Sequence, residues 1–206
     1  MMGFARKHGF KIAVLALCAA MGIYLLMTYS KSDTPKLDKL KSAPNFELTD
    51  LGGNKVTLDD SKGKVRVIYF FYANCPDICP PTTYLMTQVQ DQLKKEGTFG
   101  KDVEFMSITF DPKRDSLAAM SKFAGKFDVD TSGWKFLRED SEEATKKLMN
   151  NFGLDLIKDE KTGLFSHTDT ITIVDREGEI RKYMTGSIQD TKADDIVKVV
   201  DTLVNE

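Results

Sequence analysis

Residues 65–81 read VRVIYFFYANCPDICPP, and this stretch decides the fold class. Its first seven residues, Val65 to Phe71, are almost all apolar, β-branched or aromatic, which is typical of a strand buried on both faces of a sheet. Tyr72 to Pro81 is a loop with three prolines, and Thr82 to Leu93 then carries apolar residues at helical spacing. The sequence therefore predicts a buried strand, a loop that holds two cysteines, and a helix.

The regions on either side of this unit predict further strands and helices. A turn at residues 52–54 predicts a short hairpin, and residues 175–178 predict a second hairpin between strands over 170–174 and 180–184. The remaining expected elements are a strand over 103–110, a helix capped by Asp115 or Ser116 and ending near Lys126, a helix behind a capping box of Asp140 and Glu143, an irregular stretch over 154–168 with a turn at 159–163, and a last amphipathic helix over 196–203. This order favours an α/β domain with a thioredoxin-like sheet.

The bulk composition fits one globular domain with an appendage. The chain has 206 residues, of which 41% are apolar and 29% are charged. Its formal net charge of −2 gives no indication of a nucleic-acid partner, which would call for a basic surface.

The N-terminal residues differ from the rest of the chain. Residues 1–11 carry cations and no acidic side chain, and Ile12 to Met27 has no charge at all. About 20 residues of helix cross a bilayer, so this run extended to Tyr29 is just long enough. The preceding cations favour the cytoplasm, which places the bulk of the chain on the extracytoplasmic side, periplasmic or equivalent.

Three fates of this segment are compatible with an extracytoplasmic domain. A cleaved signal peptide needs a small-residue site, which residues 18–20 offer weakly, and a lipoprotein signal would use Cys18 but meets a bulky Leu17 before it. An uncleaved single anchor fits best, with Cys18 as a small apolar residue of the span. We therefore expect a membrane anchor over residues 1–29, a polar lysine-rich linker over 30–44 and the thioredoxin-like domain over 45–206.

Cys75 and Cys79 are the strongest chemical signal in the chain. They lie four positions apart at the expected start of a helix, where backbone N–H groups lower the pKa of a thiol. A structural disulfide is one alternative, although so small a loop gives a bridge little entropic benefit. The usual disulfide-exchange motif has two intervening residues, and the third residue here leaves room for an ion. Two thiolates favour copper(I) first and zinc second.

His167 is the one histidine outside the basic N-terminal stretch. It directly precedes the expected strand over 170–174, and in a thioredoxin-like sheet the loop before that strand faces the cysteine loop. It could therefore complete a set of two sulfurs and one nitrogen, which suits copper(I) and tolerates copper(II). Read alone, a loop histidine is more often an ordinary surface residue.

Together these motifs resemble the Sco/SenC family of copper proteins that assist cytochrome c oxidase assembly. The matching residues are YFF at 69–71, CPDICP at 75–80, SITFDPKRD at 107–115, and His167 followed by ITIVD at 171–175 and Gly178. The resemblance runs from about Pro44 to the C-terminus. It implies a thioredoxin-like fold, Cys75, Cys79 and His167 as copper ligands, and delivery of copper to the oxidase subunit that carries the binuclear copper centre.

The sequence departs from the family in places and leaves some acidic residues open. Ala73 and Asn74 stand where many members have Thr-His, so one polar group near the metal is missing. Asp111 and Asp115 are first interpreted as turn and cap residues, with a role behind the ligands or in partner docking as the alternative. Asp77, between the cysteines, has the same two interpretations.

Several functions remain possible at this point. The preferred hypothesis is a copper metallochaperone, with no catalytic residues as such. The main alternative is a membrane-tethered thiol–disulfide oxidoreductase that uses Cys75 and Cys79 to reduce cysteines of an oxidase subunit. A peroxide-reducing enzyme is disfavoured because no P-x-x-x-[TS]-x-x-C pattern precedes either cysteine. A redox or copper sensor is the remaining candidate.

Overall fold

The chain forms two compact units, Met1–Lys36 and Leu37–Glu206. The structure is a computed structural model that describes residues 2–30, 36–159, 165–167 and 169–206, with the backbone alone at 2–7, 26–30, 166 and 167. The first unit is the helix α1 (Met2–Ser30), and its stretch His8–Leu25 is long and apolar enough to cross a membrane. This helix fits a membrane anchor, as the uncharged run predicts.

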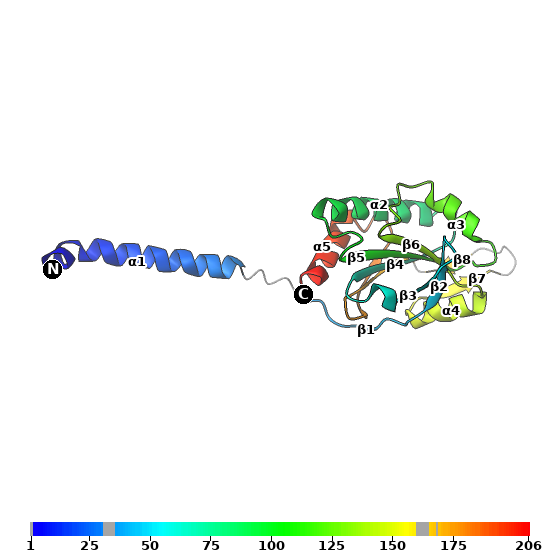
Figure 1. Ribbon diagram of the computed structural model, residues 1–206, viewed down its shortest axis with the longest axis horizontal. Coiled ribbons are helices and arrows are strands. Elements are labelled where there is room, and N and C mark those ends of the chain that lie inside the picture. Colours follow the sequence, from blue (N-terminus) through cyan, green and yellow to red (C-terminus); the bar gives the residue numbers. More distant parts are fainter. Residues whose placement is uncertain (1, 31–35, 160–164, 168) are drawn as a thin grey trace. The chain divides into compact units, whose positions relative to one another are not determined.

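The second unit, called the domain below, is built on one eight-stranded sheet (Figure 1). Its strand order is β1-β10-β9-β4-β5-β6-β2-β3, in which β4, β5 and β6 are parallel and β9 runs antiparallel to β4. The bounds are β1 Lys41–Ser42, β2 Glu47–Asp50, β3 Lys55–Thr57, β4 Val65–Phe71, β5 Val103–Thr109, β6 Trp134–Arg138, β9 Thr170–Val174 and β10 Glu179–Thr185. A separate hairpin pairs β7 (Leu156–Lys158) with β8 (Phe165–His167).

Helices cover both faces of the sheet (Figure 1). They are α2 Cys79–Glu96, α3 Leu117–Ala124, α4 Glu142–Asn151 and α5 Ala193–Val204. Successive residues of β4 point to opposite faces, so Phe71 packs against Phe123 of α3 and Phe70 against Phe152 at the end of α4, with ring centroids 5.1 and 5.5 Å apart. All seven residues of β4 are buried, as predicted for the central strand.

The predicted α/β class and thioredoxin-like sheet are confirmed, and four local expectations are wrong. Trp134–Arg138 forms β6, which was not predicted. The strand is short, and two of its five residues are charged, so it has no clear apolar pattern. Helix α2 begins at Cys79, before Thr82, because Pro80 and Pro81 occupy its first turn, where N–H groups have no helical partner.

The other two corrections concern a helix cap and the stretch over 154–168. Helix α4 is capped by Ser141, whose Oγ accepts a hydrogen bond from the Ala144 N–H at 3.2 Å, while Asp140 pairs with Arg138. The stretch expected to be irregular contains the β7–β8 hairpin. Apart from Asp159, the turn expected at 159–163 lies outside the described residues.

The residues just before the β2–β3 hairpin are held against the rest of the domain. β1 pairs with β10, with Lys41 opposite Ile180. The buried guanidinium of Arg181 donates hydrogen bonds to the carbonyl oxygens of Leu37 and Asp38, and it pairs with Asp175 and Glu206. The stretch interpreted as a linker is therefore held against the sheet from Leu37 on.

Candidate metal centre

The two cysteines lie together between the end of β4 and the start of α2. The turn after β4 is closed by the Cys75 N–H, which donates to the Tyr72 carbonyl oxygen at 3.2 Å. This turn brings the Cys75 sulfur over the first residue of α2, where the Cys79 N–H donates to Cys75 Sγ at 3.3 Å. We call residues 72–78 the cysteine loop. Both thiols are free and both residues are buried.

The surroundings of the two sulfurs make them chemically different. The Cys79 thiol and the backbone N–H groups of residues 77–79 hydrogen-bond the Cys75 sulfur and lower the pKa of Cys75 from 9.0 to about 5. The Cys75 thiolate and burial both raise the pKa of Cys79. At neutral pH, Cys75 is therefore a thiolate and Cys79 a thiol that stabilises it.

Two tyrosines line the same region. Burial and the charge on Cys75 raise the pKa of Tyr72 to about 12, and burial raises the pKa of Tyr69 well above its usual value. The Tyr69 hydroxyl is buried without a hydrogen-bond partner among the described residues. Both tyrosines are therefore neutral at neutral pH, and neither hydroxyl competes with the Cys75 sulfur for the negative charge.

His167 lies in β8, opposite Leu156 of β7. Its side chain lies outside the described residues, so its role as a ligand remains a prediction. Among the side chains that the structure does describe, no three Cys, His, Asp or Glu residues form a metal-holding group.

The residues on both sides of His167 contact the cysteine loop and the helix that follows it. Two positions before it, the Phe165 ring packs on Tyr72 at 5.7 Å between centroids and on Phe110 at 5.2 Å. Two positions after it, the Asp169 carboxylate accepts a hydrogen bond from Thr82 Oγ1 at 3.3 Å. Phe165 and Asp169 therefore lie against residues that flank the cysteine pair, Tyr72 before it and Thr82 after it.

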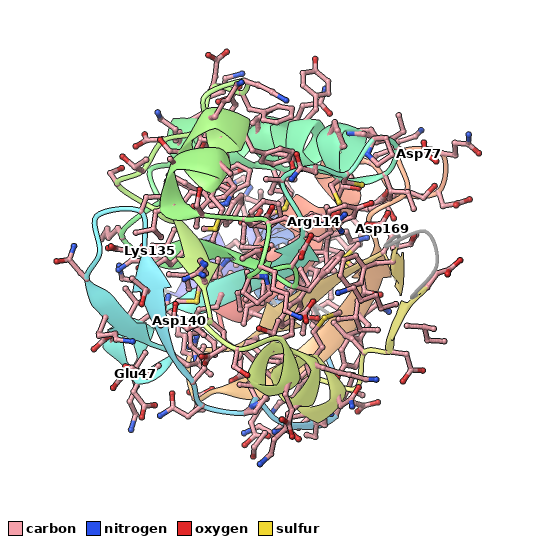
Figure 2. All side chains as sticks on the ribbon, turned by 90° about the vertical axis from the view of Figure 1, so that its right-hand side faces the viewer. Glu47, Asp77, Arg114, Lys135, Asp140 and Asp169 are labelled. Carbon is pink, nitrogen blue, oxygen red and sulfur yellow. The ribbon has the colours of Figure 1, made fainter. Side chains whose placement is uncertain are left out.

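Arg114 joins the two segments from a third direction. Its guanidinium lies 5.8 Å from the centroid of the Tyr72 ring and 5.5 Å from that of Phe165, within the range of a cation–π contact. The buried Asp111 pairs with Arg114 and fixes it. Figure 2 looks onto this end of the domain and labels Arg114 and Asp169. Sequence analysis missed Tyr72, Arg114 and Asp169, although each is within three residues of a motif residue.

Asp115 is buried and supports the cysteine loop from below. Its Oδ2 accepts hydrogen bonds from the Ala73 N–H at 2.8 Å and from Thr109 Oγ1 at 2.5 Å. Burial raises its pKa, and its Oδ1 has no partner among the described residues. The cap of α3 is Ser116, whose Oγ accepts a hydrogen bond from the Ala119 N–H. Of the two predicted cap residues, Ser116 is therefore confirmed and Asp115 is not the cap. Asp77 is exposed at the tip of the loop.

Known proteins resemble this chain in sequence. The family model described as SCO1/SenC matches residues 34–205. The SCO1 protein homolog of Bacillus subtilis is 30% identical over 156 residues, which are 75% of this chain and 79% of that protein.

Solved structures extend the likeness to the fold. The structure of BsSco, described as a member of the Sco family of cytochrome c oxidase assembly proteins with a disulfide switch, is 27% identical with a TM-score of 0.72, covering 82% of this chain and 98% of that one. The copper-bound structure of ScoI from Bradyrhizobium japonicum is 25% identical with a TM-score of 0.66, covering 79% and 99%. From the family match and these relatives, the chain belongs to the SCO1/SenC family.

Proposed function

We propose that this protein binds one copper ion through Cys75, Cys79 and His167 and delivers it to the cytochrome c oxidase subunit that carries the binuclear copper centre. The observation that carries the proposal is the packing of the His167-bearing strand on the cysteine loop, through the contact between Phe165 and Tyr72. Copper is the cargo of this reaction, and two sulfurs with one imidazole suit its monovalent form.

The environment of the sulfurs supports capture of a soft cation. Cys75 is buried and its lowered pKa leaves it negatively charged, and a buried charge attracts a cation more strongly than the same charge in water. Binding of the ion would displace the Cys79 proton, because a thiol coordinates as the thiolate. Release to a partner would reverse these steps, with the proton returning to Cys79.

The metal-site proposal is tested by titrating the reduced full chain in detergent with copper(I) against a competing chelator. We expect one copper per chain. We expect His167→Ala to weaken copper binding by at least about tenfold, because the loss of a residue that only hydrogen-bonds a metal ligand already lowers metal affinity by about that factor. The chain supplies its own control in His8→Ala, the only other histidine. Equal affinities in the two variants would refute His167 as a ligand.

The cysteines have a matched control in the same chain. Cys75→Ser and Cys79→Ser should each abolish tight binding, while Cys18→Ser in α1 should leave the affinity unchanged. Delivery is measured by mixing the copper-loaded chain with the copper-free soluble domain of the oxidase subunit. Copper that stays on the chain in the presence of excess acceptor would refute delivery while leaving the metal site intact.

A second candidate function is reduction of a partner's disulfide, favoured by the difference between the two thiols. The Cys75 thiolate would attack one partner sulfur and release the other as a thiolate, and Cys79, after losing its proton, would attack Cys75 and release the first. The partner gains two electrons and the chain ends with a Cys75–Cys79 disulfide. Copper-free turnover with a dithiol reductant, undiminished in His167→Ala, would support this role.

The anchor has a proposed orientation. The cations at residues 1–11 favour the cytoplasmic side, so the domain would face the extracytoplasmic side. Protease added to spheroplasts, whose outer barriers have been removed and whose inner membrane is intact, should then digest the domain and spare α1. Full protection of the domain under those conditions would reverse the orientation.

A further inference from the structure

A groove of about 400 Å³ lies beside the cysteine loop. One wall is formed by Asp77 and Ile78, two of the residues that separate the cysteines, and by the first turn of α2. The other walls are Asp169 and residues 185–189, which are the last residue of β10 and the start of the loop that leads to α5. Three segments that are distant in sequence therefore enclose it.

The groove is held rigidly by contacts beneath it. Thr82 Oγ1 donates to the Gly186 carbonyl oxygen at 3.0 Å, and the Gly186 N–H donates to the Asp169 carbonyl oxygen at 3.0 Å. A Cβ at position 186 would lie 2.6 Å from Thr82 Cγ2 and from Asp169 Oδ1, so only glycine allows this close approach. A preformed groove binds a partner with a smaller loss of conformational entropy, because its loops are already ordered before binding.

Its surface combines apolar and acidic character. The side chains of Ile78 and Ile188 are 38% and 56% exposed, and they are two of the five large apolar side chains exposed among the described residues of the domain. Asp77 and Asp169 also line it, and none of its lining residues is basic. Figure 2 shows both aspartates on the same side of the domain, near the start of α2.

From this lining we infer that the groove is the docking site for a segment of the copper-accepting protein that presents an aliphatic side chain next to a lysine or arginine. The aliphatic side chain would pack between the two isoleucines, and the cation would lie near the two carboxylates. The inference rests on the proposed function, because it takes the acceptor as the partner. It adds the place and the chemistry of contact, with the partner held directly against the residues between the ligands.

The test is a pair of opposite charge changes at the exposed Gln189, which lines the groove and is not a proposed ligand. The full chain in detergent is titrated with the copper-free soluble domain of the oxidase subunit, and Kd is measured at low and high salt. We expect Gln189→Lys to raise Kd about fivefold and Gln189→Glu to lower it by a similar factor, as for one unit charge at a few ångströms near water. Salt should shrink both effects.

Controls separate docking from general charge and folding. Asn205→Lys at the far end of α5, about 18 Å along the helix, should change Kd by less than about twofold. Ile188→Asp should weaken docking by about tenfold or more, whereas Leu40→Asp, a similarly exposed aliphatic side chain next to β1, should not. All of these variants should keep the copper affinity of the wild type, which reports that they are folded.

The possible results distinguish failure of the groove as the docking site from failure of the proposed copper delivery. No binding of the acceptor by the wild type, or equal shifts in Gln189→Lys, Gln189→Glu and Asn205→Lys, would overturn the groove as the docking site. Copper transfer with unchanged Kd values across the variants would keep the proposed delivery and reject the groove. The expected order of Kd values without copper transfer would keep the groove and reject delivery.

Discussion

Replacing Cys79 by alanine tests the physical origin of the Cys75 thiolate. The Cys79 thiol is the largest cause of the lowered pKa of Cys75, ahead of the backbone N–H groups of the loop. A hydrogen bond to a charged group is worth about 1.5–3 kcal/mol, and one pKa unit corresponds to about 1.4 kcal/mol. Cys79→Ala should therefore raise the pKa of Cys75 from about 5 to about 6–7, with the rest of the lowering kept by the amides.

The assay is the pH dependence of Cys75 alkylation in the Cys18→Ser background, followed by mass spectrometry. The midpoint is the informative quantity, because the reactivity of each thiolate itself rises with its pKa and would mask a change in rate at a single pH. Cys79→Ser keeps a hydroxyl donor at the same place and should leave the midpoint closer to that of the wild type. A midpoint unchanged in Cys79→Ala would show that the amides alone stabilise the thiolate and would refute this account.

Three further predictions address the support of the site. Phe165→Ala should weaken copper binding without moving the alkylation midpoint of Cys75, because it loosens the histidine-bearing strand and leaves the sulfurs in place. The control Ile157→Ala on β7, where the side chain is 66% exposed, should change neither the copper affinity nor the midpoint. Asp115→Ala should lower the free energy of unfolding by about 2–4 kcal/mol, because it leaves a loop amide and a hydroxyl without a hydrogen-bond partner. The measurement is a urea titration followed by the fluorescence of the single tryptophan, in which Asp115→Asn should lose about half as much stability. The reduced chain should lose stability as pH falls from 9.0 through about 5, because the folded state lowers the pKa of Cys75 and so binds its proton less tightly than the unfolded state; a slope unchanged in Cys75→Ser would contradict this.

The sequence predicts the centre of the fold well because the strongest patterns lie there. Every residue of Val65–Phe71 except Arg66 is apolar or aromatic, and such a run is typical of a strand buried on both faces at the centre of a sheet. The turn at 175–178 likewise predicts the β9–β10 hairpin from local chemistry alone. In contrast, β6 is short and two of its five residues are charged, so its place beside β5 is decided by tertiary packing of Trp134, whose indole N–H donates to Ser107.

At the candidate site, the sequence predicts the proximity of the two cysteines but not the residues that support them, and His167 as a ligand stays a prediction. The spacing of Cys75 and Cys79 indicates their proximity, although Cys75 lies in a turn before the helix and not on its surface. The contact of Arg114 with two aromatic rings joins three distant segments, and no local pattern reports such a contact. The same holds for Asp115, whose partner amide lies 42 positions earlier in the chain.

The position of β9 in the sheet has a consequence for the order in which the domain assembles. β4 pairs along one edge with β5, which follows soon after it, and along the other edge with β9, which arrives only near the end of the chain. Closing the long chain segment between β4 and β9 is slower than forming local contacts, so we expect the two thiols to come together before the strand that follows the histidine is in place. During refolding, copper or an oxidant would thus meet a bare dithiol first, and the timing of metal addition should decide which species is trapped.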